Sequence, residues 1–165
     1  MEGQASDERT ARLREENRHA LIEMIRLMGR IDRSRASAAD GGYAEGRYPD
    51  FYCPDGRLDI PFMPEGLKNY REGSAEHSAD AELRFRLFSE FEWVGEFEVH
   101  DCLDPASFIV FAKSRATTCR GLPYENSYVF FATMRDGKIA ALREYADTSR
   151  LGVLQDDLAA AGSFD

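Results

Sequence analysis

The chain has 165 residues, of which 43% are hydrophobic and 12% aromatic, a composition typical of a packed globular domain rather than a disordered chain. Its formal net charge of −9 argues against nucleic acid and anionic membranes as partners, because both attract basic surfaces. There is no run of about 18 apolar residues and no signal-peptide core, and the three cysteines are widely spaced. We therefore expect one cytoplasmic domain over residues 1–165, with frayed tails at 1–5 and 161–165 and no metal site.

Helical patterns fill most of the first half of the chain. Apolar residues at helical spacing predict a helix from about Ser6 to Met28. The expected elements that follow are a short helix near 43–47, a turn at 54–56, a short strand at 58–62, a short helix after Pro64 broken at Gly73-Ser74, and a helix over 78–88.

Strand patterns dominate the second half. Alternation of apolar and polar residues predicts strands over 92–100 and 107–115, then a hairpin over 124–147, and a final helix from about 148 to 160. Helices followed by a run of antiparallel strands indicate an α+β fold, in which a curved antiparallel sheet packs against the N-terminal helices as a cone. The interior of such a cone is an apolar pocket suited to a small molecule.

The hairpin contains a carboxylate where a charge is costly. Glu144 lies between Leu142 and Ala146 in a mostly apolar strand, so either a partner or a function keeps it there. A two-residue Asp136-Gly137 loop would place Glu144 opposite Val129.

A three-residue loop starting at Arg135 would instead place Glu144 opposite Tyr128, on the face of Tyr124 and Asn126. We favour this register because it sends Arg143 and Glu125 together to the other, wet face. It also surrounds Glu144 with groups that hydrogen-bond a buried carboxyl.

These side chains suggest acid–base chemistry. Burial raises the pKa of a carboxyl, so Glu144 could both take and give protons with Tyr124 as its partner. Asp80 could be a second acid or base, or a solvated helix residue, and Arg84 could bind a substrate carboxylate or lie on the surface. The alternative for Glu144 is an ion pair with an arginine such as Arg84, which would only tie the sheet down.

Several short motifs resemble the phenazine-biosynthesis A/B proteins, a branch of the SnoaL-like group that shares the cone-shaped, cystatin-like α+β fold of ketosteroid isomerase. They run in the family's order from about Glu16 to Asp147. The motifs are Glu16-Asn17-Arg18, Gly29 with Asp32-Arg33, Asp55-Gly56, Phe88-Ser89-Glu90-Phe91-Glu92-Trp93, Tyr124-Glu125-Asn126, Asp136-Gly137-Lys138-Ile139 and Arg143-Glu144-Tyr145.

The resemblance implies a homodimer that works without metal or cofactor on a small, carboxylated or polyketide-like substrate. The family promotes the condensation of two amino-oxo-cyclohexene carboxylic acids through imine chemistry. Carried over by position, its acid–base glutamate is Glu144, its tyrosine is Tyr124, and its carboxylate-binding arginine falls near Arg47.

Two positions of this chain depart from the family. Counting back from Trp93, the family's histidine falls on Asp80 and its serine falls on Arg84, while His77 lies one helical turn before Asp80. The chain therefore resembles a relative with an altered pocket. Asp80 and His77 join the catalytic candidates, and the candidate substrate-binding residues are Arg47, Arg84, Tyr128, Asn126 and Trp93.

Three functions remain open at this point. The first is a biosynthetic enzyme that uses Glu144 for condensation, cyclisation, dehydration or isomerisation of a natural-product intermediate. The second is an epoxide-hydrolase-like relative, which would need an Asp–Arg–Asp set that the sequence does not clearly supply. The third is a non-catalytic binding or assembly protein on the same fold.

Overall fold

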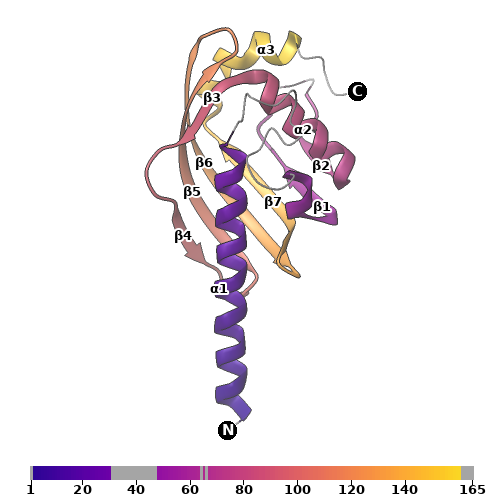
Figure 1. Cartoon of the computed structure of the whole chain (residues 1–165), viewed down its shortest axis with the longest axis vertical. Helices are drawn as coiled ribbons and strands as arrows, with labels where there is room; N and C mark the ends of the chain where they lie inside the picture. The colour runs from indigo at the N-terminus through magenta and orange to yellow at the C-terminus, as the bar shows by residue number, and fades with distance from the viewer. Residues whose placement is uncertain (1, 31–47, 64, 66, 161–165) are drawn as a thin grey trace.

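A long helix crosses one face of a curved sheet. The computed structural model describes residues 2–30, 48–63, 65 and 67–160, so Arg47 and the short helix expected near 43–47 lie outside the described residues. Helix α1 spans Glu2–Met28, and its N-terminal half projects beyond the sheet (Figure 1). Its C-terminal half packs Leu21, Met24 and Ile25 into the main core, as the helical spacing predicts. In the part of the chain that the structure describes, no helix is long and apolar enough to cross a membrane.

The remaining elements form one seven-stranded sheet with helices at one end. They are η1 (Tyr48–Phe51), β1 (Tyr52–Asp59), β2 (Tyr70–Glu72), α2 (Gly73–Leu87), β3 (Phe88–Trp93), β4 (Glu98–Asp101), β5 (Ser107–Thr118), β6 (Pro123–Arg135), β7 (Lys138–Ala146), η2 (Thr148–Leu154) and α3 (Gln155–Ala160). The strand order is β2-β1-β7-β6-β5-β3, and β4 pairs with β5.

The α+β class and the curved sheet are confirmed, but the sheet is mixed and unclosed rather than wholly antiparallel. Strand β1 pairs with β7 in parallel, whereas the other strand pairs are antiparallel. A parallel pair needs a long connection between its strands. Here that connection contains β2, α2 and strands β3 to β6, and α2 packs beside β1 (Figure 1).

Three local predictions in the middle of the chain are wrong. Residues 54–56 lie within β1, where the pairing with β7 is irregular between Tyr52 and Arg57. Tyr70 belongs to β2 rather than to a helix, and α2 begins at Gly73, whose positive φ of 75° suits the sharp change from strand to helix. The strand expected over 92–100 is two strands, separated by a loop at Gly95, which also has a φ of 75°.

The β6–β7 hairpin has the predicted faces but not the predicted loop. Asp136 and Gly137 have φ values of 53° and 72°, which is the geometry of a two-residue loop. Thr133 pairs with Ala141 and Met134 pairs with Ile139, so Ala140 is an extra residue on β7.

This bulge puts Glu144 opposite Phe130, neither of the two partners expected. Because the extra residue shifts β7 by one position, Glu144 still faces inward with Tyr124 and Tyr128 while Arg143 faces outward. The face is therefore as predicted, although the bulge rather than a longer loop produces it.

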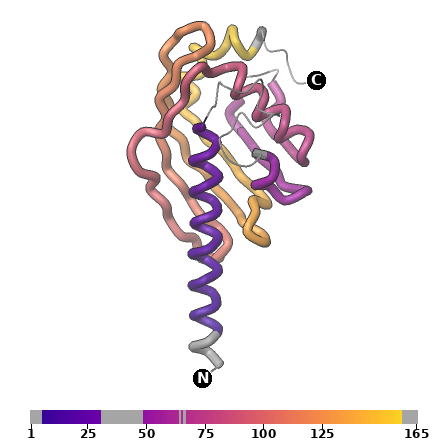
Figure 2. The backbone as a smooth tube through the Cα atoms, viewed as in Figure 1, coloured from indigo at the N-terminus to yellow at the C-terminus, as the bar shows by residue number. Residues whose placement is uncertain are grey.

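A second apolar cluster closes the end of the sheet near α2. Leu154 and Leu158 of the C-terminal segment pack there against Leu83, Leu87 and Tyr124. Figure 2 shows this C-terminal segment and α2 at the opposite end of the domain from the N-terminus of α1.

Candidate active site

A small cavity lies between α2, the inner face of β6 and β7, and the C-terminal segment. Its volume is about 100 Å³. The lining residues are Ile60, Phe62, Met63, Arg71, Asp80, Leu83, Arg84, Leu87, Phe88, Phe91, Tyr124, Tyr128, Glu144, Ala146, Thr148, Leu151, Leu154 and Leu158. Most of these are apolar, while four charged side chains and two phenols gather in one part of the wall. Few precisely placed polar groups in an apolar cavity are typical of a small-molecule site.

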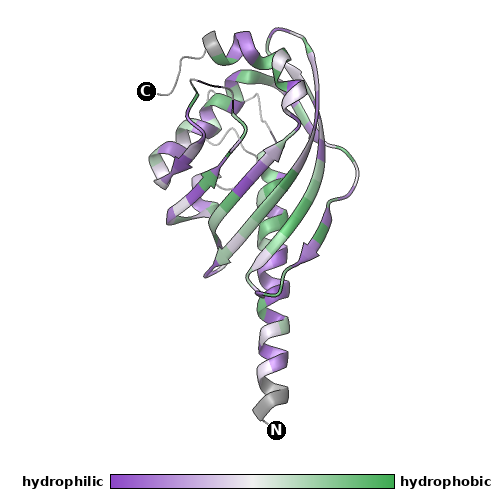
Figure 3. Ribbon diagram, turned by 180° about the vertical axis from the view of Figure 1, so that it is seen from behind, coloured by the Kyte–Doolittle hydropathy of each residue, from purple (hydrophilic) through white to green (hydrophobic). Residues whose placement is uncertain are grey.

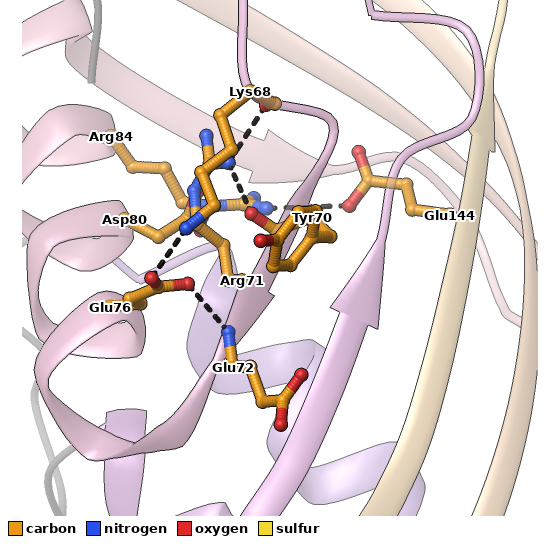
Figure 4. A network of polar contacts seen from close by, with 8 residues as sticks. All are labelled: Lys68, Tyr70, Arg71, Glu72, Glu76, Asp80, Arg84 and Glu144. Atoms are coloured by element: carbon orange, nitrogen blue, oxygen red, sulfur yellow. Dashed lines mark hydrogen bonds and ion pairs between the residues drawn. The ribbon is translucent and has the colours of Figure 1, made fainter. Parts of the chain in front are cut away.

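Four charged side chains form a continuous row from β2 to β7 (Figure 4). Arg71 Nε lies 3.3 Å from Asp80 Oδ1, and Asp80 Oδ2 lies 3.0 Å from Arg84 Nε. Arg84 Nη2 then reaches Glu144 Oε2 at 3.3 Å. Burial of these charges is tolerated because each contacts an opposite charge.

The row is anchored at its β2 end. Arg71 Nη1 donates hydrogen bonds to the carbonyl oxygens of Lys68 at 2.8 Å and Tyr70 at 2.7 Å. Glu76, near the start of α2, accepts a hydrogen bond from the amide nitrogen of Glu72 and pairs with Lys68. Arg71 before the junction between β2 and α2 and Glu76 after it therefore hold this junction in place. These contacts fix the position of the helix that carries Asp80 and Arg84.

Glu144 is the titratable carboxyl at the end of this row. Its side chain is 9% exposed, and burial raises its pKa above the ordinary range. The nearby guanidinium of Arg84 acts in the opposite direction and offsets part of that rise. A carboxyl whose pKa is raised by burial gives up its proton less readily than a solvated one and can serve as an acid as well as a base.

Two tyrosines of β6 complete the polar wall. The Tyr124 hydroxyl accepts a hydrogen bond of 2.6 Å from Asn126 Nδ2, and the hydroxyls of Tyr128 and Ser114 lie 3.2 Å apart. Burial raises the pKa of Tyr124 and raises that of Tyr128 well above 10, so both phenols remain protonated. They can therefore act as neutral hydrogen-bond donors beside Glu144.

The structure brings together five of the candidate residues named from the sequence: Asp80, Arg84, Tyr124, Tyr128 and Glu144. Asp80 is 3% exposed, which excludes the solvated position considered above. Glu144 does pair with Arg84, the alternative considered for it.

Asn126 lies behind the wall rather than in it. Its Oδ1 accepts hydrogen bonds from the backbone nitrogens of Ser127 at 2.7 Å and Asp147 at 2.9 Å. Its Nδ2 holds the Tyr124 hydroxyl. Asn126 therefore orients Tyr124 and does not line the cavity as a substrate-binding residue would.

His77 and Trp93 lie elsewhere. His77 is fully buried, stacks on Tyr52 with ring centroids 3.8 Å apart, and its Nε2 lies 2.9 Å from Gly56 O. The Trp93 indole donates a 2.6 Å hydrogen bond to Ile25 O and lines a separate, larger hollow of about 590 Å³ at the end of α1. That hollow lacks the buried charges that could do chemistry, so the smaller cavity is the better candidate.

Arg71 is the site residue that the sequence did not indicate. It is 2% exposed, yet its partner Asp80 lies nine positions later on another element, so no local pattern joins them. The sequence shows Arg71 only as a charged residue next to Tyr70, in a segment that is predicted to be helical. Within the described ranges, no group of three or more His, Cys, Asp or Glu side chains could hold a metal ion.

Comparison with known proteins supports the fold. No protein-family model matches the chain, and none of the curated proteins matches it. Among solved structures, it is similar to a phenazine-biosynthesis-related protein from Pseudomonas aeruginosa, with 21% identity and a TM-score of 0.68 over 94% of this chain and 91% of that one.

Two further structures show the same architecture. An NTF2-like protein from Burkholderia xenovorans has 20% identity and a TM-score of 0.63 over 84% of this chain and 95% of that one. TerC, co-crystallised with polyporic acid, has 20% identity and a TM-score of 0.59 over 86% of this chain and 98% of that one. The chain therefore has the cone-like α+β fold of these proteins.

Proposed function

We propose that the protein is an acid–base enzyme of natural-product biosynthesis, and that Glu144 transfers the proton. The observation that carries this proposal is the position of Glu144, a buried carboxyl with a raised pKa in the wall of an apolar cavity. Such a group takes a proton from carbon or nitrogen in one step and returns it in another. Condensation, cyclisation, dehydration and isomerisation all use these two steps.

Tyr124 is the proposed partner of Glu144. It lies on the same face of the hairpin, lines the same cavity and is held in place by Asn126. A neutral phenol can donate a hydrogen bond to a carbonyl oxygen that becomes negative as Glu144 removes the adjacent proton. Arg84, at the same wall, supplies positive charge for an anionic substrate group.

The comparisons favour a biosynthetic setting for this chemistry. The Pseudomonas aeruginosa protein is named for phenazine biosynthesis, and TerC was crystallised with polyporic acid. Both names support a natural-product intermediate as the substrate of this chain.

A proton-exchange assay tests the proposal without knowledge of the natural substrate. We expect the protein to speed deuterium incorporation next to the carbonyl of cyclohexanone, a neutral ketone that leaves Glu144 ionised, in D₂O, followed by proton NMR. Glu144→Gln should slow this exchange about 100-fold or more while the probe still binds. Glu125→Gln, which changes an exposed glutamate on the outer face of β6, is the matched control and should retain the wild-type rate. Equal rates in the wild type and in Glu144→Gln would contradict the proposal.

A second function is favoured by one specific observation. Asp80 and Glu144 flank the guanidinium of Arg84, so the structure supplies a carboxylate–arginine–carboxylate set that the sequence did not clearly show. Such a set could activate water against an epoxide: one carboxylate takes a proton from water, the oxygen attacks carbon, and the other carboxyl protonates the epoxide oxygen. Hydrolysis of cyclohexene oxide in H₂¹⁸O would give a labelled diol and identify this reaction.

We also propose that the protein works as a homodimer through the outer face of the sheet. Figure 3 views the sheet from this side, with α1 behind it. Phe111 and Phe131 are 41% and 46% exposed there, and the Tyr145 ring lies 6.2 Å from that of Phe131. A second copy of the chain would cover these side chains, since monomeric proteins rarely expose a contiguous apolar patch.

A further inference from the structure

Two ion pairs of Arg84 differ in kind. Its contact with Asp80 joins two residues of one helix, and Arg71 holds Asp80 from the other side. Its contact with Glu144 joins the helix to the sheet through a single nitrogen, at a wall that both residues line. A ligand that enters the cavity can therefore replace Glu144 at Arg84 while Asp80 stays in place.

The charges of the row restrict what such a ligand can be. Arg71, Asp80, Arg84 and Glu144 carry two positive and two negative charges when Glu144 is ionised, so these four charges balance. An anionic ligand at Arg84 would then place a second negative charge beside an ionised Glu144 among buried side chains, which is unfavourable. A proton on Glu144 removes this repulsion and leaves one positive charge for the ligand to balance.

We propose that the cavity binds a small molecule with one anionic group by exchange at Arg84, and that each binding event transfers one proton from solvent to Glu144. Ionised Glu144, the ligand anion and one proton give a complex with a neutral Glu144 carboxyl, and no bond of the ligand changes. This inference rests on the site of the proposed function and adds to it. With an anionic substrate bound, Glu144 would therefore begin the reaction as the acid and would take a proton only after it has given one.

The groups that face Glu144 from each neighbouring element support this choice of proton acceptor. Asp80 and Arg84 face it from α2, and Arg71 does so from β2. The phenols of Tyr124 and Tyr128 on β6 have raised pKa values and stay neutral throughout. The other described lining residues, from the 60–63 segment, α2, β3, β7 and the C-terminal segment, are Ile60, Phe62, Met63, Leu83, Leu87, Phe88, Phe91, Ala146, Thr148, Leu151, Leu154 and Leu158, and none of these titrates.

Calorimetry of benzoate binding tests the inference. One ring suits a cavity of about 100 Å³, and benzamide is the neutral control of the same shape. At a pH above the pKa of Glu144, the binding enthalpies in Bis-Tris and in Tris, two buffers without an anionic form, should differ. The difference should equal the difference between the ionisation enthalpies of the two buffers times about one proton taken up. The affinity for benzoate should fall about tenfold per pH unit in this range, whereas benzamide should show neither effect. Equal enthalpies in both buffers, or no benzoate binding at millimolar concentration, would overturn the inference.

Two variants separate the proton acceptor from the anion site. Glu144→Gln should bind benzoate with no proton uptake and no pH dependence in the same range. Proton uptake that persists in this variant would mean that another group takes the proton.

Arg84→Gln takes the positive charge away from Glu144, which is also what a ligand at Arg84 would do. The Glu144 carboxyl, followed by carbon-13 NMR without ligand, should therefore titrate at higher pH than in the wild type. An unchanged titration would overturn the exchange at Arg84. If benzoate binding takes up a proton but the protein does not catalyse deuterium exchange, only the proposed function is contradicted. If the protein catalyses deuterium exchange but benzoate binding takes up no proton, only this inference is contradicted.

Discussion

Arg71 Nε lies 3.3 Å from Asp80 Oδ1, and the two side chains are only 2% and 4% exposed. The contact joins β2 to α2 at the point where the chain changes from strand to helix. It also holds Asp80 from the side opposite to Arg84. Arg71 is therefore both a stabilising residue and a positioning residue for the row of charges that ends at Glu144.

Arg71→Met should destabilise the protein by about 3 kcal/mol, because it removes one of the two cations that compensate a buried carboxylate. Chemical denaturation followed by circular dichroism would measure the free energy of unfolding. Arg115→Met is the control, since Arg115 also bridges two carboxylates, Glu92 and Glu125, but is 60% exposed. Its loss should have a much smaller effect, and similar losses in both variants would show that the burial of Arg71 is not what matters.

His77 should make the protein less stable in acid. Burial lowers its pKa below the ordinary value of about 6.5, so the folded state binds its proton less readily than the unfolded state. The contribution of His77 is thus complete above about pH 6.5 and is lost as the pH falls through the folded-state pKa, by up to about 1.4 kcal/mol per pH unit. Unfolding free energies measured from pH 7.5 to 5 should fall more steeply in the wild type than in His77→Gln. Parallel curves would refute this role.

Gly29→Ala should disturb the packing of the single tryptophan. A Cβ atom at Gly29 would lie 2.5 Å from Trp93 Nε1, and the indole cannot retreat without loss of its hydrogen bond to Ile25 O. We expect a loss of about 1–3 kcal/mol and a shift in tryptophan fluorescence. Gly152→Ala is the control, because nothing lies within 4 Å of its added Cβ. A fluorescence spectrum of Gly29→Ala that matches the wild type would contradict the close contact.

Phe131→Glu should dissociate the proposed homodimer. The new carboxylate would lie opposite Ile109 on β5 and Arg143 on β7, and a second copy would have to desolvate it together with the exposed Arg143. Sedimentation velocity should then report the mass of one chain for the variant and of two for the wild type. Leu103→Glu adds the same charge at a fully exposed position, Leu103 being at the tip of the β4–β5 connection, and should remain dimeric. A wild-type protein that sediments as a single chain would contradict the proposed homodimer.

The sequence predicted those parts of the fold that local patterns determine. The helical stripe at Leu21 and Ile25, the long alternating strands β5 and β6, and the inward face of Glu144 follow from residue spacing, and the structure confirms them. It could not predict the parallel pairing of β1 with β7, because partners so distant in the chain leave no trace in either strand.

In the candidate site, too, residues set by local patterns could be predicted, and residues set by distant contacts could not. Glu144 and Tyr124 could be named because they lie on one hairpin, where alternation shows which side chains share a face. Arg71 could not, since its burial depends on Asp80, a residue on another element. His77 was misplaced for the related reason that one helix presents different faces to the cavity and to Tyr52.

The bulge at Ala140 interrupts the alternation of side chains along β7. Ile139 and Leu142 both face inward although they are three positions apart, because the extra residue between them is not paired with β6. A deletion of Ala140 would restore regular alternation and leave Glu144 opposite Phe130, with Arg143 still facing outward. In comparisons with related sequences, a gap of one residue at position 140 is therefore compatible with an unchanged position of the proposed proton-transfer residue.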